Sequence, residues 1–255
     1  MKSDTKLKIL AIIKQNDSVR VHDIISQLEL NHTGIFRHLL DLQLSGDIYK
    51  IGTPPFVRYF LKTNIMEDSK SEVLQNIWRW AQSGDPHAVT GDQLCPTRDV
   101  FQARSARLLP VLQKELNEGL SFLLLAVVDE IGNNSYDHNL GNWIDIAGAV
   151  LAHDETNRII ILSDRGQGVR KTISKVRANL KNDEDALQVV FTEIISGRAP
   201  EQRGNGLKFV KKVIEENNLM LTYFSGSGIC EIVNRKMEIK HHTNSIPGML
   251  AVIKY

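Results

Sequence analysis

The sequence predicts an α+β protein made of a small N-terminal unit and a larger C-terminal one. Two observations lead to this prediction. Within the first 61 residues, three segments with helical spacing of apolar residues precede two runs rich in β-branched and aromatic residues. From about residue 92 onward, helical segments are interspersed with short apolar runs that are typical of strands of one sheet. A chain of 255 residues suits two modest domains or one large one, and 42% apolar residues support a packed core.

Composition bears on where the protein works and on whether it binds nucleic acid or a membrane. The formal net charge of +1 gives no overall sign of a nucleic-acid or membrane partner. The two cysteines, Cys95 and Cys230, are far apart and lack ligand-like neighbours, which favours a reducing cytosol. The strongest apolar run, 122–128, is too short to span a bilayer, and the polar start lacks a secretory signal. We therefore expect a cytoplasmic protein without a membrane partner.

The N-terminal unit is predicted to cover residues 1–63. Its helices are expected at 6–16, 22–28 and 31–44, with a short extended piece at 19–21 and strands at 48–51 and 57–61. Asn31 is a suitable N-cap for the third helix, and Gly46 ends it. The loop between the strands contains Gly52-Thr53-Pro54-Pro55. Three helices followed by a hairpin resemble the winged helix-turn-helix domains of bacterial regulators.

This resemblance implies DNA contacts from four side chains. Arg37 and His38 would lie on the recognition helix, and Lys50 and Arg58 on the wing. Residues 1–62 carry nine basic and six acidic residues, a mild bias of +3. The same arrangement also serves dimerisation or protein contact, and the sequence leaves both interpretations open.

Residues 64–91 are predicted to form a linker with one helix, at 71–82. Trp78 and Trp80 on this helix are expected to pack between the two units. The larger unit, 92–255, is then predicted to contain helices at 99–116, 119–138 and 207–216, strands at 143–150, 158–163, 219–224, 229–233 and 249–254, and an irregular segment at 169–197 with a helix from 183 to 195.

Three motifs in the larger unit contain residues that can bind a ligand or take part in catalysis. In the first, Glu130, Asn134 and Asp137 have the spacing that places them on one face of a helix. An amide oxygen suits Mg²⁺, and a Glu one turn away can act as a base towards a water or hydroxyl. A simple amphipathic helix with a solvated polar end is the alternative.

The second motif is Asp164-Arg165-Gly166-Gln167-Gly168, directly after the apolar run 159–163. An Asp at the end of a buried strand can accept a hydrogen bond from the amine of adenine, and Gly166 and Gly168 remove side chains beside the base. A tight turn is the alternative. The spacing fails the dinucleotide fingerprint, since position 171 is Lys, and no P-loop motif occurs.

The third motif is Gly204-Asn205-Gly206, which precedes a predicted helix starting at Leu207. Free N–H groups at a helix start bind phosphate, and Arg203 beside it adds a charge-assisted donor. A flexible loop is the alternative.

Together the three motifs resemble the GHKL (Bergerat-fold) ATP-binding superfamily of gyrases, chaperones, mismatch-repair proteins and histidine kinases. The resemblance covers about residues 95–255 and implies a GHKL α/β sandwich that binds ATP and Mg²⁺. It implies that Glu130 is the base, that Asn134 holds Mg²⁺, and that 169–203 is a lid over the nucleotide. The cofactor contacts it implies are Asn134, Asp137, Asp164, Gly166, Gly168, Arg203, Gly204, Gly206 and Leu207.

Two positions depart from the superfamily's pattern. The third motif often carries a further Gly where this chain has Lys208, which implies a stiffer lid hinge. Gly248 is followed by Met249 instead of the usual Thr, which puts a minor contact to the base in doubt.

These resemblances imply a cytosolic ATP-binding regulatory protein whose nucleotide state controls a winged helix that binds DNA or a partner. The alternatives are an anti-sigma-type serine kinase or a histidine-kinase-related phosphotransferase, and a DNA-binding repressor that has lost nucleotide. No His-Glu-x-x-Arg-like phosphoacceptor helix precedes the ATP domain, which argues against an autophosphorylating kinase. The expected partners are adenine nucleotide, DNA or a protein, and a second copy in a homodimer.

Overall fold

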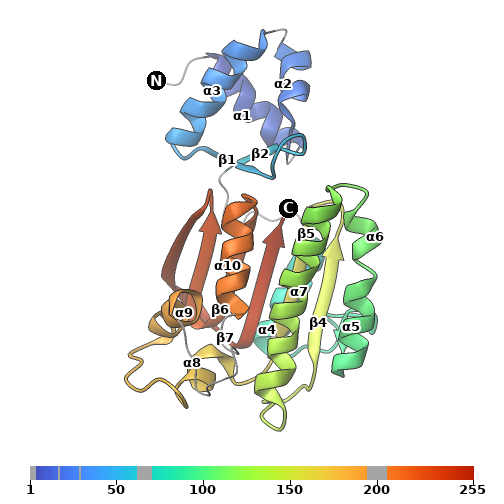
Figure 1. Cartoon of the computed structure of the whole chain (residues 1–255), viewed down its shortest axis with the longest axis vertical. Coiled ribbons are helices and arrows are strands. Elements are labelled where there is room, and N and C mark those ends of the chain that lie inside the picture. Colours follow the sequence, from blue (N-terminus) through green and yellow to red (C-terminus); the bar gives the residue numbers. More distant parts are fainter. Residues whose placement is uncertain (1–3, 17, 29, 62–70, 194–205) are drawn as a thin grey trace. The chain divides into compact units, whose positions relative to one another are not determined.

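A computed structural model describes residues 4–16, 18–28, 30–61, 71–193 and 206–255 (Figure 1). The chain divides into two compact units, Met1–Ser69 and Lys70–Lys254. Helices and a five-stranded antiparallel sheet occur together, so the predicted α+β class is confirmed. Within the described ranges, no helix is both long enough and apolar enough to cross a membrane.

The N-terminal unit contains three helices and a two-stranded hairpin. Asn31 caps the third helix by accepting a hydrogen bond from the Gly34 amide at 2.8 Å, as predicted. Val19 forms a bridge with Tyr59 of the hairpin. Side chains from all three helices and both strands, such as Ile13, Ile24 and Leu39, fill one core. The elements are α1 (Asp4–Asn16), α2 (Val21–Leu28), α3 (His32–Leu44), β1 (Ile48–Ile51) and β2 (Arg58–Leu61).

The second unit begins with α4 (Glu72–Ser83), which the sequence placed in a linker. Ser71 caps this helix and also donates a hydrogen bond to Asp154 at 2.5 Å. Trp80 is fully buried, and Trp78 packs edge-on against Phe224 of the sheet. The boundary between the units therefore falls at residues 69–70 rather than near residue 92. Both tryptophans pack within the second unit, because the sheet offers an apolar face that α4 covers.

The sheet of the second unit has the strand order β3-β4-β5-β7-β6. Asn234 and Arg235 both have positive φ and join β6 to β7 in a two-residue hairpin turn. The two strands expected at 219–224 and 229–233 are one strand, because register shifts near Gly226 and Gly228 interrupt the pattern without ending the pairing. The strands are β3 (Leu94–Cys95), β4 (Ala149–Asp154), β5 (Ile159–Asp164), β6 (Met220–Val233) and β7 (Lys236–Lys254).

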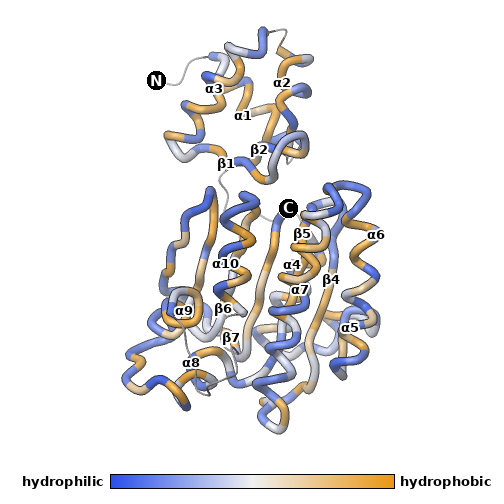
Figure 2. The backbone as a smooth tube through the Cα atoms, in the orientation of Figure 1, coloured by the Kyte–Doolittle hydropathy of each residue, from blue (hydrophilic) through white to orange (hydrophobic). Residues whose placement is uncertain are grey.

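Helices cover both faces of this sheet. Phe224 contacts Trp78 of α4, whereas its neighbour Tyr223 packs against Phe191 of α9 (Asp183–Thr192). Successive strand residues point to opposite faces, so α4 and α9 lie on opposite sides. Figure 1 shows α7 (Glu118–Asn139) and α10 (Gly206–Glu216) in front of the sheet and α4 behind it. The strands between them contain hydrophobic stretches in Figure 2, and every residue of β5 is buried.

Several predicted elements of this unit are wrong in extent. The strand expected at 249–254 begins at Lys236, and the helix expected at 183–195 ends at Thr192. The single helix expected at 99–116 is split into α5 (Arg98–Ala106) and α6 (Leu109–Leu112), since Pro110 lies in the first turn of a new helix. The strand expected at 143–150 runs from 149 to 154. Its apolar residues before 149 belong to an irregular segment in which Asp145 pairs with Arg165. The remaining helix is α8 (Gly168–Ile173).

Helices α5 and α7 approach each other closely at a glycine. A Cβ atom added to Gly132 of α7 would overlap the ring of Phe101, which is fully buried. By contrast, a Cβ atom on Gly119, in the first turn of α7, would lie 3.6 Å from its nearest neighbour, at ordinary contact distance. The two glycines therefore offer a matched pair on one helix.

We expect Gly132→Ala to lower the free energy of unfolding by about 1–3 kcal/mol, because the methyl group forces Phe101 out of its position. Gly119→Ala should leave it unchanged or raise it by roughly 0.4–1 kcal/mol, since alanine restricts the unfolded chain. Urea unfolding followed by circular dichroism measures both. Equal effects at the two sites would show that the contact with Phe101 is not tight.

Candidate functional site

Asp164 ends β5 and is buried against the end of α7. Its Oδ2 accepts a hydrogen bond from the Ser135 hydroxyl at 2.7 Å. Its Oδ1 accepts from the Gly166 amide at 2.8 Å and from Nδ2 of Asn139 at 3.3 Å. The structure thus brings the second motif against the helix that carries the first.

Burial raises the pKa of the Asp164 carboxyl above its ordinary value, although hydrogen bonds from Ser135, Gly166, Met249 and Asn139 oppose the shift. Burial disfavours the charged form because the site is shielded from water. A buried carboxyl with a raised pKa is a common feature of functional sites.

The glycines of the second motif allow close packing around Asp164. A Cβ atom on Gly166 would overlap the carboxamide of Asn139. Gly168 has φ of +77°, a conformation that favours glycine, and it starts α8. The next amide, of Val169, donates to the Ser225 hydroxyl at 2.9 Å, and that hydroxyl donates to the Gly248 carbonyl at 2.8 Å. The turn is therefore fixed against both α7 and the β6–β7 hairpin.

Glu130 lies on α7 and is half-buried. Its pKa is raised, first by burial and then by the negative charge of Asp137, while a hydrogen bond from the Asn134 side chain opposes the shift. A Cβ atom on Gly206 would overlap the Glu130 carboxylate. The start of α10 therefore lies directly against Glu130, so the first and third motifs also meet.

The remaining residues that the sequence predicts for this site are not hydrogen-bonded to Asp164 or Glu130 in the described part of the chain. Asp137 is half-exposed and forms an ion pair with Arg98 of α5, so the structure gives it a partner within the protein. Leu207 is partly buried in the first turn of α10. Arg203 and Gly204 lie outside the described residues.

Three residues of the site were not predicted from the sequence: Ser135, Asn139 and Ser225. Ser135 and Asn139 are four residues apart on α7, on the face that meets Asp164. Their spacing is a usable signal, because a buried carboxylate needs donors and these two extend the polar face of the same helix. Ser225 lies about 60 residues from the turn it binds, and the sequence holds no signal for that contact.

Arg165 extends from the same turn towards the opposite side of the sheet. Its buried guanidinium donates from Nε to Asp145 Oδ1 at 2.8 Å and from Nη2 to Oδ2 at 2.5 Å. Its Nη1 donates to the carbonyls of Trp80 and Ala81, at 3.1 and 2.6 Å. Arg165 thus holds the last turn of α4 and the segment before β4 on the turn that contains Asp164.

The predicted DNA contacts of the N-terminal unit are only partly available. Arg37 and Lys50 are exposed. The Nδ1 atom of His38 is buried and has no hydrogen-bond partner among the described residues. Arg58 is half-buried and donates to the Ser18 hydroxyl at 3.2 Å, and its pKa is lowered, mainly by burial. The exposed surface of α3 also carries large apolar residues, notably Leu40.

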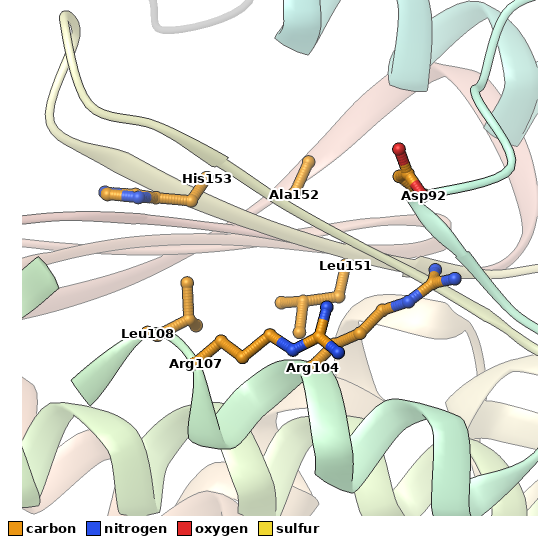
Figure 3. Close-up of a pocket in the computed structure, with 7 residues that line it drawn as sticks. All are labelled: Asp92, Arg104, Arg107, Leu108, Leu151, Ala152 and His153. Atoms are coloured by element: carbon orange, nitrogen blue, oxygen red, sulfur yellow. The ribbon is translucent and has the colours of Figure 1, made fainter. Parts of the chain in front are cut away.

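A separate groove lies between α5 and β4 (Figure 3). It measures about 190 Å³ and is lined by Arg107, Leu108 and His153 among others. Small-molecule sites usually measure about 300–1,000 Å³, so this groove is too small for a nucleotide. Arg104 beside it donates to the carbonyls of Leu94 and Gly91, at 2.8 and 3.0 Å, which is a structural role. None of the residues predicted to bind nucleotide lines this groove.

Comparison with known proteins does not assign the chain to a family. No model of a protein family matches the sequence, and no curated protein does. Among the residues that the structure describes, no three His, Cys, Asp or Glu side chains form a group suited to a metal ion. The assignment of a function therefore depends on the geometry of the site.

We expect Asp164→Asn to change how stability depends on pH. Because the native Asp164 has a raised pKa, it keeps a proton that the unfolded chain releases, so the wild type loses stability as the pH rises through this interval. The variant should lack this loss, which amounts to at most about 1.4 kcal/mol per pH unit. Urea unfolding at several values between about pH 4 and pH 8 measures it. The exposed Asp92→Asn variant is the control, and equal slopes in all three proteins would contradict the role of burial.

Proposed function

We propose that the larger unit binds an adenine nucleotide with Mg²⁺ in a GHKL-like site, and that the chain is a nucleotide-responsive regulatory protein. The observation that carries this proposal is the meeting of three distant motifs on one helix. Asp164 is hydrogen-bonded to Ser135 of α7, and Gly206 lies against Glu130 of the same helix. The turn after β5 and the start of α10 therefore both contact α7, the helix that carries the first motif.

Asp164 supplies the contact to the base. A buried acceptor beside glycines is suited to an exocyclic amine, because the backbone lets a flat ring approach. The carboxyl already accepts from Ser135, Asn139 and the Gly166 amide. The contact from Asn139 is the longest at 3.3 Å, and it is the one that the base amine would replace.

Glu130 and Asn134 supply the chemistry at the phosphates. The Asn134 side chain acts on the Glu130 carboxyl and lowers its pKa, so the two side chains lie close together, and the amide oxygen of Asn134 is a suitable ligand for a cation. Magnesium is commonly held by one or two protein oxygens together with phosphates and waters, so this donor set fits the ion. Bound there, Mg²⁺ would neutralise phosphate charge. The raised pKa of Glu130 makes it a stronger base towards a nearby water or hydroxyl.

The start of α10 supports the same site. Its N-terminal amides are unpaired by the helix itself and carry the positive end of the helix dipole, which favours phosphate. The position of Gly206 against Glu130 brings these amides to the helix that holds the proposed base. Nucleotide binding at this point would change the surface that the protein offers to a partner.

Hydrolysis and transfer are the two possible reactions at such a site, and a protein kinase is the second candidate. Glu130 serves either reaction, since it would deprotonate a water in one and a protein hydroxyl in the other. Incubation with γ-labelled ATP separates them. Free labelled phosphate indicates an ATPase, a labelled protein indicates a kinase, and an unchanged nucleotide indicates a binding module.

We expect Asp164→Asn to weaken binding of Mg-ATP by about 1–3 kcal/mol, because an amide replaces the carboxyl group that accepts the hydrogen bond from the base amine. Isothermal titration calorimetry measures the affinity. His153→Ala, in the groove between α5 and β4, is the control and should bind like the wild type. If the wild type binds no adenine nucleotide, or if Asp164→Asn binds as tightly, the proposed site is wrong.

We expect Glu130→Gln to keep its affinity for Mg-ATP but to release no phosphate and transfer none, because the amide cannot take a proton. Asn134→Ala should instead make nucleotide affinity independent of Mg²⁺, since the cation loses its protein oxygen. Calorimetry with and without Mg²⁺, together with phosphate release from labelled ATP, separates the two effects. Turnover at the wild-type rate in both variants would contradict the roles given to α7.

A further inference from the structure

The exposed face of α3 carries a row of large apolar side chains. Phe36, Leu40 and Leu44 are 43%, 56% and 79% exposed. A spacing of four residues places them one above the other along the helix. Single exposed apolar residues are ordinary on a protein surface, but a contiguous row along one helix indicates a contact surface. We call Phe36, Leu40 and Leu44 the α3 row.

The chemistry of this row does not suit DNA. Base edges are recognised by hydrogen-bonding side chains, and phosphates by cations. Arg37 is the one lysine or arginine among the exposed side chains of α3, and the exposed His32 packs against Phe36 with ring centroids 4.5 Å apart. Lys6 of α1, the nearby cation, is paired with Asp41 of α3 at 2.9 Å. The face therefore fits a protein partner with an apolar surface.

The even spacing of the row fits a second copy of the chain. Phe36 lies four residues before Leu40, and Leu44 lies four residues after it. A two-fold axis through Leu40 that sets two α3 helices antiparallel therefore places Phe36 of one copy against Leu44 of the other. Leu40 then meets itself at the axis. A surface that is complementary to itself in this way is what a two-fold dimer requires.

The charges beside the row have the same symmetry. Arg37 and Asp41 lie on one flank of the row, three residues before Leu40 and one residue after it. The two-fold operation keeps both copies of this flank on the same side. It brings Arg37 of one copy to within about 3 Å, along the helix axis, of Asp41 of the other. Two Arg37–Asp41 contacts thus lie along one flank of the apolar contact, with Asp41 also paired with Lys6 of its own copy. Opposite charges in this arrangement favour the antiparallel orientation.

We propose that the N-terminal unit self-associates as a two-fold dimer through α3, with the α3 row at its centre and Arg37–Asp41 pairs at its rim. The interface leaves Lys50 on β1 outside the contact between the helices. The inference concerns this surface alone and holds whether or not the larger unit binds nucleotide.

The test is the mass of the full chain in solution, measured by sedimentation velocity over a range of concentrations. The wild type should be a dimer, and Leu40→Glu should raise the dimer dissociation constant by about 100-fold or more, because two like charges meet at the axis. Val176→Glu is the matched control, since Val176 is also 56% exposed but lies in the second unit. Far-UV circular dichroism and thermal unfolding verify that both variants are folded.

A cross-linking experiment tests the orientation. Leu40→Cys should give a dimer with a short bis-maleimide, because the two thiols lie on either side of the axis, whereas Val176→Cys should not. The native Cys95 and Cys230 are buried and do not compete. A chain that is monomeric at all concentrations would overturn the proposal, as would a dimer that Leu40→Glu leaves intact. A monomer whose DNA affinity falls in Leu40→Glu would show instead that this face binds nucleic acid.

Discussion

The second unit depends on one turn at the end of β5, where an acidic residue, Asp164, and a basic residue, Arg165, point to opposite faces of the sheet. Asp164 is bound by Ser135 and Asn139 of α7, and Arg165 by Asp145 and the last carbonyls of α4. Both side chains are buried, so each requires the hydrogen bonds it makes. The alternation of a strand sends them to different layers. The turn therefore fixes α7 and α4 on the two faces of the sheet at the same point.

This arrangement has a consequence for the site. A ligand that replaces a hydrogen-bond donor to Asp164 would act on this residue directly. The next residue, Arg165, donates hydrogen bonds to carbonyls in the last turn of α4. The backbone between Asp164 and Arg165 is a direct path from the proposed base contact to the opposite side of the sheet. Helix α4 is also the first described element after the segment that follows the N-terminal unit. Within the second unit, the proposed nucleotide site and this helix are thus connected through a rigid, buried turn rather than through a loop.

The N-terminal unit shows how a fold and a surface can indicate different partners. Three helices followed by a hairpin are an order that DNA-binding regulators also use. The exposed side chains of α3 nevertheless form an apolar row. Because the fold is determined by the buried residues and the partner by the exposed ones, the same scaffold serves either role. The side chains on the surface are therefore the better guide to what this unit binds.

The sequence by itself determined the α+β class, most elements of both units, and the three motifs, because apolar periodicity, caps and glycine-rich turns are local signals. It also led to the prediction, which the proposed experiments test, that Glu130, Asn134 and Asp164 belong to one site. Only the tertiary structure showed that α4 packs on the sheet, since that depends on an apolar face formed by strands more than a hundred residues later. Tertiary structure likewise decided that Ser135, Asn139 and Ser225 satisfy the turn, that Asp137 pairs with Arg98, and that the apolar row of α3 is exposed. Contacts between distant segments depend on packing, which no local pattern of residues encodes.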